Sequence, residues 1–534
     1  MNAPINPFRL FLRPLLCGGA CLLLSHSALY AGSATWSSNP ISNEWNDPSN
    51  WIPATVPNGE ADVATFAASS QTTVSISAGI EVHSIVFEQG ANAFTLVLES
   101  PADPVIEMAI YGTGIINNSG VLQNFIARTG PNFQKAVFSF YNSSSAGAPT
   151  SFKVEASKSS TDNHSEIDFY NSSSADGAII TNEGPAFISA FGGTTAFWDS
   201  ATAGSATIEV NGGRIANALN AHTYFYDVSS ADHATLIVKP ALGANAFGGY
   251  INFLDSSTAA QATLIARGTI TGHSVGRVDF SDATDGASAR VELFGNGTLG
   301  IGAHFSRGIQ IGSIEGDGSV DLGRNPLTVG TNNRSTTFSG QIQDGGVGGS
   351  LSKIGTGTLI LSGASNYAGA TTISEGFLRV DNTVSSGTGY GPVLVNAGTL
   401  GGKGIIADAV TIGSGSGSGA FIAPGSGNTT LTIQSTLTFR SDGTYTWRVR
   451  PGGKSDKLVA NGVTIESGAQ IAGLGRGTLT AGTMFTAISN TSDNPITGTF
   501  ANLADGETIK IGSNTFQANY EGGDGNDLTL TVVQ

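Results

Sequence analysis

A phenylalanine recurs six times through the middle of the chain at nearly constant spacing. The pattern apolar-x-Phe-x-Asx-Ser-x-x-Ala, then Ala-Thr-apolar, recurs with it with some substitutions, and successive phenylalanines are 29, 28, 28, 28 and 27 residues apart. Such regular spacing indicates that each copy is one structural unit. The six residues are Phe140, Phe169, Phe197, Phe225, Phe253 and Phe280.

A stripe of small and aliphatic residues follows each phenylalanine with a period of two. In the third copy it consists of Ala206, Ile208 and Val210. A period of two predicts a β-strand with one buried face. A helical repeat such as TPR or ankyrin does not fit this period or the many Gly and Thr residues, and β-propeller blades are longer.

A repeat of this length with short strands and Gly, Asn or Ser turns fits one coil of a β-solenoid. Coils stack about 4.8 Å apart, so like side chains are expected to form ladders, Phe on Phe. We therefore predict an all-β, elongated parallel β-helix with an aromatic N-terminal lead-in and a C-terminal β cap. Right-handed crossovers are the general preference for parallel strands, and we expect that hand here.

The regions on either side of the repeats have different patterns. We expect an N-terminal β lead-in or cap over 32–105, the repeated solenoid over 106–300 and further Gly-punctuated solenoid over 301–420. Longer alternating runs over 421–534 predict a C-terminal β unit. Caps are expected at both ends because the open end of a solenoid promotes aggregation.

Residues 1–31 have the pattern of a secretory signal peptide. Arg9 and Arg13 precede a short apolar run, and small residues follow it up to Ala31. The run is too short to span a membrane, and no later segment is long enough either. We therefore expect an exported chain with no transmembrane segment in its mature part.

Cysteine usage and charge remove several classes of function. Cys17 and Cys21 are the only cysteines and both lie in the signal, which excludes a disulfide scaffold, a cysteine nucleophile and a zinc–thiolate site in the mature chain. Only 12% of the 534 residues are charged and 73 are Gly, which argues against a helical bundle. The net charge of −16 disfavours binding to nucleic acid.

Residues 353–382 read KIGTGTLILSGASNYAGATTISEGFLRVDN. This segment resembles the autotransporter-associated β-strand repeat, K-x-G-x-G-T-L-x-L-S-G-x-N-x-Y-x-G-x-T-x-I-x-x-G-x-L-x-V. The stretches WNDPSNW near the start and YEGGDGNDLTLTV near the end are also similar to secreted bacterial proteins that carry this repeat. The matching residues are Lys353, Gly355, Gly357, Thr358, Leu359, Leu361, Ser362, Gly363, Asn366, Tyr367, Gly369, Thr371, Ile373, Gly376, Leu378 and Val380.

The resemblance implies a passenger-like β-helix that is extracellular or on the bacterial cell surface. The resemblance covers the passenger part and not a translocator barrel. The residues after 382 are too few and too Gly-rich for a membrane barrel with aromatic girdles. Export through a barrel of its own is therefore not expected.

An Asn or Asp recurs two residues after each phenylalanine. In four copies it is Asp199, Asp227, Asp255 or Asp282, so stacked coils would place these carboxylates on adjacent rungs. The simpler interpretation is that each caps its own turn through an Asx hydrogen bond and stays solvated. The alternative is a cation ladder or a shared proton.

Three further patterns suggest chemistry but have structural explanations. Gly272–Gly276 satisfies G-x-S-x-G, yet no helix pattern follows it, as a nucleophile elbow requires. Gly522–Asp527 resembles a single calcium nonapeptide, for which we expect a closing turn instead. The tryptophans Trp36, Trp45 and Trp51 could stack on sugar rings, but we expect them to cap the core.

No metal site is expected from the histidines, which show no ligand spacing and are predicted to be scattered over surfaces and turns. They are His83, His164, His222, His233, His273 and His304.

A long, repeated Thr-, Ser- and Asn-rich surface without a reactive cluster favours a non-catalytic adhesin-like or structural protein that contacts glycans or the cell envelope. The alternative is a secreted polysaccharide lyase or glycoside hydrolase, because β-helices also carry such activities. Acids beside Arg267, Arg277 or Arg290 in a cleft would favour this alternative. The sequence indicates no cofactor and no catalytic residue, and it leaves the ligand and the oligomeric state undetermined.

Overall fold

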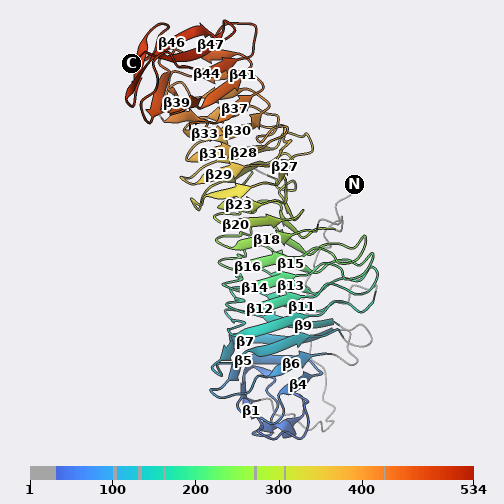
Figure 1. The fold of residues 1–534 in the computed structure, drawn as a ribbon. Coiled ribbons are helices and arrows are strands. Elements are labelled where there is room, and N and C mark those ends of the chain that lie inside the picture. The colour runs from blue at the N-terminus through green and yellow to red at the C-terminus, as the bar shows by residue number, and fades with distance from the viewer. Residues whose placement is uncertain are drawn as a thin grey trace.

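A computed structural model describes residues 32–99, 105–129, 135–159, 164–269, 274–305, 308–417, 419–425 and 427–533. The predicted signal peptide, Cys17, Cys21, Gly272 and His273 lie outside these residues. The described chain forms a rod, a parallel β-solenoid of about 16 turns, with its first coils at one end and its last strands at the other (Figure 1). Within these residues the only helical element is the short 3-10 helix η1 (Pro48–Asn50). The prediction of an all-β parallel solenoid is confirmed.

Sheet I runs along one side of the rod and contains 14 strands. From β3 onward the pairs are parallel, and the chain completes one coil between neighbouring strands. The strands are β2 (Trp51–Ile52), β1 (Ala34–Trp36), β3 (Gly59–Phe66), β5 (Ile80–Phe87), β7 (Val105–Asn117), β9 (Lys135–Phe140), β11 (Glu166–Phe169), β13 (Thr194–Phe197), β15 (His222–Phe225), β17 (Tyr250–Phe253), β19 (Arg277–Phe280), β21 (Thr298–Gly300), β24 (Ser319–Asp321) and β27 (Gln341–Gln343).

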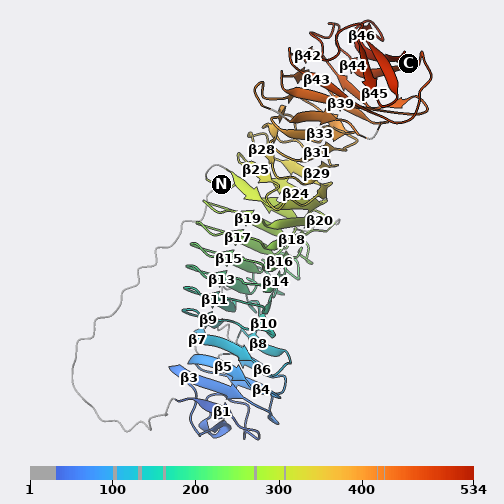
Figure 2. The same cartoon turned by 90° about the vertical axis from the view of Figure 1, so that its left-hand side faces the viewer.

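Sheet II runs beside it for almost the whole length of the rod (Figure 2). Each strand pairs in parallel with the next one listed here, except β40, which pairs antiparallel with β39. The strands are β4 (Thr73–Ile76), β6 (Thr95–Leu98), β8 (Gln123–Ala127), β10 (Thr150–Val154), β12 (Ile179–Asn182), β14 (Thr207–Val210), β16 (Thr235–Val238), β18 (Thr263–Arg267), β20 (Arg290–Phe294), β23 (Ser313–Gly316), β26 (Thr336–Phe338), β29 (Thr358–Leu361), β31 (Phe377–Val380), β33 (Gly398–Gly402), β36 (Ala420–Ala423), β39 (Gly443–Arg450), β43 (Gln470–Gly475) and β40 (Lys454–Ser455).

The third side of the rod changes along its length. Between Gly114 and Asp285 it is a column of single β-bridges, one per coil. Farther along, sheet III takes its place. Its strands are β22 (Ile309–Ile311), β25 (Pro326–Val329), β28 (Ser350–Lys353), β30 (Thr371–Ile373), β32 (Val393–Val395), β35 (Val410–Ile412), β38 (Leu437–Phe439) and β42 (Val463–Ile465).

Sheet IV starts with three parallel pairs and ends in three antiparallel pairs that close the C-terminal end, where the alternating runs after residue 421 predict a cap. Antiparallel pairing ends the template that a parallel coil would otherwise expose. Its strands are β34 (Ile405–Ile406), β37 (Thr430–Ile433), β41 (Lys457–Ala460), β44 (Met484–Asn490), β47 (Asp527–Val532), β46 (Asn514–Gly522) and β45 (Thr508–Ile511).

The repeated phenylalanines form a ladder in the core, as the 28-residue spacing predicts. Phe197, Phe225 and Phe253 are fully buried. Neighbouring rings in this part of the ladder are stacked, with centroids 4.7 Å apart. That spacing equals the distance between paired strands, so the backbone pairing and the ring stacking share one period.

Aromatic residues also close the N-terminal end of the core. Trp36, Trp45 and Trp51 are each no more than 2% exposed. Trp51 packs edge-on against Trp36 and Trp45 with centroids 5.1 and 4.7 Å away. The prediction that these tryptophans cap the core is confirmed. The predicted domain boundaries at residues 105, 300 and 420 stay predictions. Sheets I and II run without a break across the first two of them.

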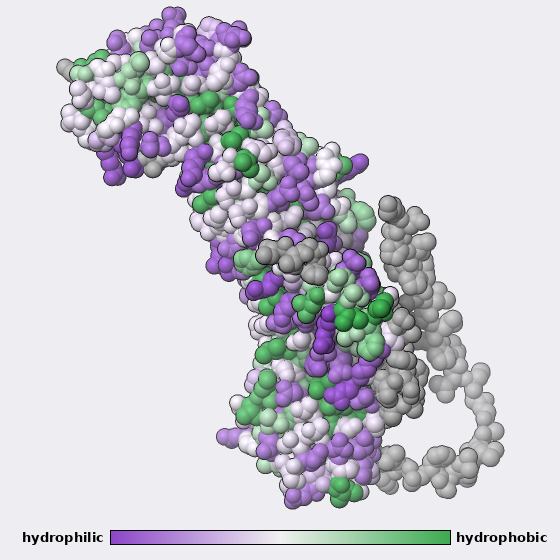
Figure 3. Space-filling model, turned by 45° about the vertical axis from the view of Figure 1, so that its right-hand side comes forward, coloured by the Kyte–Doolittle hydropathy of each residue, from purple (hydrophilic) through white to green (hydrophobic). Residues whose placement is uncertain are grey.

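Three long connections from sheet II to sheet I stack into a ridge that projects beside β11, β13 and β15 (Figure 1). We call residues 183–193, 211–221 and 239–249 the loop ridge. Backbone hydrogen bonds join its successive loops, such as Ser189 N–H to the Asn217 carbonyl at 3.1 Å. Ile188 and Leu242 on the ridge are 61% and 71% exposed, and hydrophobic side chains gather on this side of the molecule (Figure 3).

A candidate aromatic and acidic groove on sheet I

The outer face of sheet I is hollowed at β13. This strand places only Thr194 and Ala196 on the outer face, in register with Glu166 and Asp168 of the preceding coil. The strands on either side, β11 and β15, lie about 10 Å apart, two strand spacings. Because the side chains between them are short, the face forms a groove of about 370 Å³.

A ladder of half-buried aromatic rings borders this groove. It uses the residue directly after a buried core position, which is a phenylalanine in all of these coils except that of Tyr111. The side chain points outward because the core position before it points inward. Trp198 stacks on Tyr226 with centroids 4.0 Å apart and planes within 8°. Tyr170 lies 6.2 Å from Trp198 on the other side, and Tyr141 and Tyr111 continue the ladder at 4.9 Å spacing.

More rings surround the groove from other elements. His222 and Tyr224 of β15 stack with centroids 5.3 Å apart. Phe191 comes from the loop ridge and lies 6.0 Å from the ring of His164. The Trp198 indole N–H is buried and has no hydrogen-bond acceptor among the described residues. A buried N–H group without an acceptor costs free energy.

Two carboxyl groups on β11 face the same groove in different electrostatic states. Burial acts to raise the pKa of Glu166, but a hydrogen bond from His164 and the charge of Lys135 outweigh it, and the pKa is lowered. His164 Nε2 lies 3.1 Å from Glu166, and Lys135 pairs with the same carboxylate. Burial, followed by the charge of Glu166, raises the pKa of Asp168 to about 7. The Tyr170 hydroxyl donates to Asp168 at 3.3 Å.

This arrangement suits a carbohydrate. Aromatic faces pack on the C–H faces of sugar rings, and buried polar groups bind the hydroxyls at the ring edge. Burial and then the charge of Asp168 raise the pKa of Tyr170 above its ordinary value, so this phenol stays a neutral donor and acceptor. The groove therefore offers stacking surfaces and polar groups side by side.

Sequence reasoning missed this groove. A Tyr or Trp follows the repeated phenylalanine at positions 141, 170, 198 and 226, and this column could have been found in the sequence. The prediction that the histidines are scattered is wrong for His164 and His222, which line one groove although 58 residues separate them. Their proximity depends on the coil register and on the loops before β11 and β15.

The Asp column lies at a turn beside sheet I. Asp199, Asp227, Asp255 and Asp282 have φ between 53° and 55°. This is the left-handed region, which Asx residues tolerate well and which explains why the column is Asx. Each carboxylate accepts the backbone N–H of the preceding coil, as Asp255 does from Asp227 at 3.0 Å. The expected bond within the same turn is thus replaced by a bond between coils.

The cation ladder stays a prediction. Among the described residues there is no group of three or more His, Cys, Asp or Glu side chains placed to hold a metal ion. One oxygen of Asp227 and one of Asp282 are engaged by N–H groups at 2.9 and 3.1 Å.

The other sequence motifs have structural explanations. Gly276 directly precedes strand β19 instead of a helix, so its context is not that of a nucleophile elbow. Gly522 and Asp527 face each other across the turn between the antiparallel strands β46 and β47, as a closing turn requires. No helix in the described part of the chain is long and apolar enough to cross a membrane.

The three arginines considered for catalysis are not beside the Asp column. Arg277 pairs with Asp279 at 2.7 Å, and Tyr250 donates to the same carboxylate at 3.0 Å. Arg290 pairs with Glu292 at 2.9 Å. Arg267 packs over Phe294, 5.9 Å from the ring centre.

Comparisons with known proteins agree with the resemblance seen in the sequence. Residues 351–380 match the passenger-associated-transport-repeat family. The chain is 40% identical over 123 residues to the adhesin BmaC autotransporter of Brucella suis biovar 1 (strain 1330), a match that covers 22% of this chain and 3% of that protein. It is 30% identical over 157 residues to an extracellular serine protease of Serratia marcescens, covering 29% of this chain and 14% of that protein.

Among solved structures, the Haemophilus influenzae Hap adhesin matches 89% of this chain and 64% of its own, with 12% identity and a TM-score of 0.25. The chain spans only a small part of both curated relatives. The repeat match and the two relatives confirm the passenger-type resemblance and the extracellular or cell-surface location. The chain is an exported β-helix that resembles autotransporter passengers.

Proposed function

We propose that this protein is a non-catalytic, adhesin-like β-helix that binds glycans through the aromatic and acidic groove on sheet I. The observation that carries the proposal is the pairing of the outward aromatic ladder with the hollow at Thr194 and Ala196. The adhesin name of one relative supports the same class of function. A rigid rod also suits adhesion, because it holds the groove away from the surface that carries it.

The test is glycan binding by the full mature chain and by a Trp198→Ala variant, first on a glycan array and then by calorimetry with the best ligand. Stacking of a nucleic-acid base on an aromatic side chain is worth about 1–3 kcal/mol. With the same range for a sugar ring, we expect affinity to fall roughly tenfold to a hundredfold. Tyr111→Ala is the matched control, since Tyr111 belongs to the same ladder but does not line the groove. Equal losses in both variants, or none in Trp198→Ala, would count against the groove.

A second candidate function is glycan cleavage in the same groove. It rests on the adjacent carboxyl groups Glu166 and Asp168, whose pKa values move in opposite directions, a pattern typical of an acid and a base. Incubation with polysaccharides followed by reducing-end detection distinguishes the two functions. Cleavage that disappears in both Glu166→Gln and Asp168→Asn would establish the enzyme, whereas binding without cleavage supports the adhesin.

A further inference from the structure

A second groove lies on the other side of the loop ridge, against the outer face of sheet II. Its volume is about 570 Å³, within the range of ligand sites. Thr181 of β12 and the backbone of Gly184 and Gly212 form part of its lining. Leu242 of the ridge adds an apolar edge.

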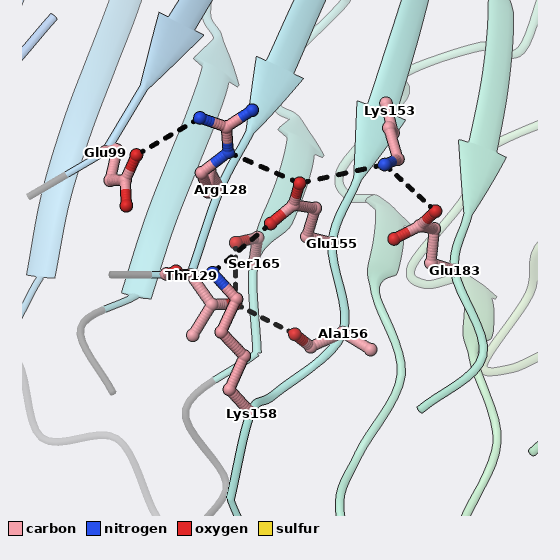
Figure 4. A network of polar contacts seen from close by, with 9 residues as sticks. All are labelled: Glu99, Arg128, Thr129, Lys153, Glu155, Ala156, Lys158, Ser165 and Glu183. Carbon is pink, nitrogen blue, oxygen red and sulfur yellow. Dashed lines mark hydrogen bonds and ion pairs between the residues drawn. The ribbon is translucent and has the colours of Figure 1, made fainter. Parts of the chain in front are cut away.

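A column of residues supplies charges around this groove. In each coil the column residue is the one at the C-terminal end of the sheet II strand or directly after it. At the N-terminal end the column is electrically matched (Figure 4). Arg128 contacts Glu99 and Glu155 at 3.3 and 3.4 Å, and Lys153 contacts Glu183 at 3.1 Å. Every cation drawn there therefore faces a carboxylate.

Where it meets the groove, the same column runs from Glu183, which lines the groove and is paired with Lys153, to cationic residues. Asn211, Lys239 and Arg267 follow Glu183 on successive coils, about 4.8 Å apart. Lys239 has a partner in Glu209 at 2.5 Å. Arg267 is exposed and has no carboxylate within ion-pair distance among the described residues.

The loop ridge adds one more cation to the same groove. Arg214 lies on the ridge, is exposed, and likewise forms no ion pair with a described carboxylate. Two unpaired guanidinium groups and Lys239 thus converge on one hollow in a chain whose net charge is −16. Like charges held together raise the electrostatic energy, and an anion between them lowers it. Guanidinium groups bind carboxylate and sulfate oxygens through paired N–H donors.

We propose that this groove binds an acidic polysaccharide, with Arg214 and Arg267 on its carboxylate or sulfate groups and Leu242 against a ring. The length of the groove along several coils favours a polymer over a single small anion. The site is separate from the aromatic groove and stands whether or not that groove binds a glycan.

The experiment compares the mature chain with an Arg214→Gln/Arg267→Gln double variant by biolayer interferometry. The probes are polygalacturonate for carboxylate, heparin for sulfate, dextran as the neutral polymer and duplex DNA as another polyanion. Arg324→Gln/Arg334→Gln is the matched control, because it removes two exposed arginine charges outside the groove. Trp198→Ala serves as the control for the aromatic groove.

We expect the chain to bind polygalacturonate or heparin with a marked dependence on salt, and the groove variant to bind at least tenfold more weakly. Preference for one of these probes identifies the anionic group. The Arg324→Gln/Arg334→Gln variant and the wild type are expected to bind alike, whereas any loss in Trp198→Ala measures the separate contribution of the aromatic groove. Binding of dextran is expected to be the same in the wild type and in the Arg214→Gln/Arg267→Gln variant. Equal binding by the groove variant, an equal loss in the matched control, absence of binding to both polysaccharides, or equally tight binding of DNA would each overturn the proposal.

Discussion

The pH dependence of folding stability measures how much the buried charge of Asp168 in the aromatic and acidic groove destabilises the protein. Burial raises its pKa to about 7, whereas an Asp in an unfolded chain has a pKa of about 3.9. Between these values the folded chain holds more protons than the unfolded chain, so stability falls as the pH rises from about 4 to about 7. Above pH 7 the loss is complete, and below pH 4 it is absent.

The magnitude follows from the size of the shift. Three pH units at about 1.4 kcal/mol each give an upper bound of about 4 kcal/mol for the penalty of the buried charge. Asp168→Asn removes the charge and keeps an oxygen for the Tyr170 hydroxyl. Asn252 already occupies the same outward column farther along sheet I, so the shape is compatible with the sheet. We expect the variant to be more stable than the wild type by about 1–4 kcal/mol at pH 8 and equally stable at pH 4.

Urea denaturation followed by tryptophan fluorescence, together with hydrogen exchange of the β11 to β15 peptides, measures the difference at both pH values. Asp279→Asn is the matched control, because Asp279 lies in the same column but pairs with Arg277. Burial raises the pKa of Asp279 as well, but the charge of Arg277 opposes this shift, so the Asp279 variant is expected to gain less stability at pH 8 than Asp168→Asn. A stability gain for Asp168→Asn that is the same at pH 4 and pH 8, or a loss at pH 8, would refute the reasoning.

Two further predictions concern the repeated columns. Phe225→Ala removes a fully buried ring stacked on both neighbours, so we expect the free energy of unfolding to fall by about 3–5 kcal/mol in urea denaturation. The control Phe187→Ala, at a 47% exposed position, is expected to change this free energy by less than about 0.5 kcal/mol. Similar effects of the two variants would contradict the ladder as a source of stability. The Asp199 to Asp282 column accepts backbone N–H groups, so we expect the same melting temperature in calcium and in chelator, and a calcium-dependent rise of several degrees, lost in Asp227→Asn, would establish the cation ladder instead.

The fold could be predicted because the same pattern of core positions recurs in each copy of the repeat. A phenylalanine every 28 residues and a period-2 stripe require parallel strands whose core positions align, and Phe197, Phe225 and Phe253 stack accordingly. The Asx column was predictable for a related reason, since its left-handed φ recurs in each copy. Each of these features depends on residues within a single copy, which the sequence alone displays.

The grooves were not predictable in the same way, because they depend on how copies differ. The hollow at Ala196 exists because Asp168 and Tyr224, its neighbours on adjacent coils, are larger. His164 and His222 line one groove although His164 precedes β11 and His222 begins β15, two coils along. The cationic groove likewise requires that the loop ridge carry Arg214 to the level of Arg267.

A solenoid therefore makes sites where it departs from its own repeat. Identical coils give uniform columns of side chains, and uniform columns leave no local hollow between neighbouring coils. One coil has the small Ala196 where its neighbours have larger outward residues, and this difference opens the groove on sheet I. Along one column of sheet II, Glu183 in one coil is followed two coils later by Lys239, so the charge reverses. Both departures lie within the same few coils and on the two sides of the loop ridge, so both proposed binding grooves lie in the middle of the rod.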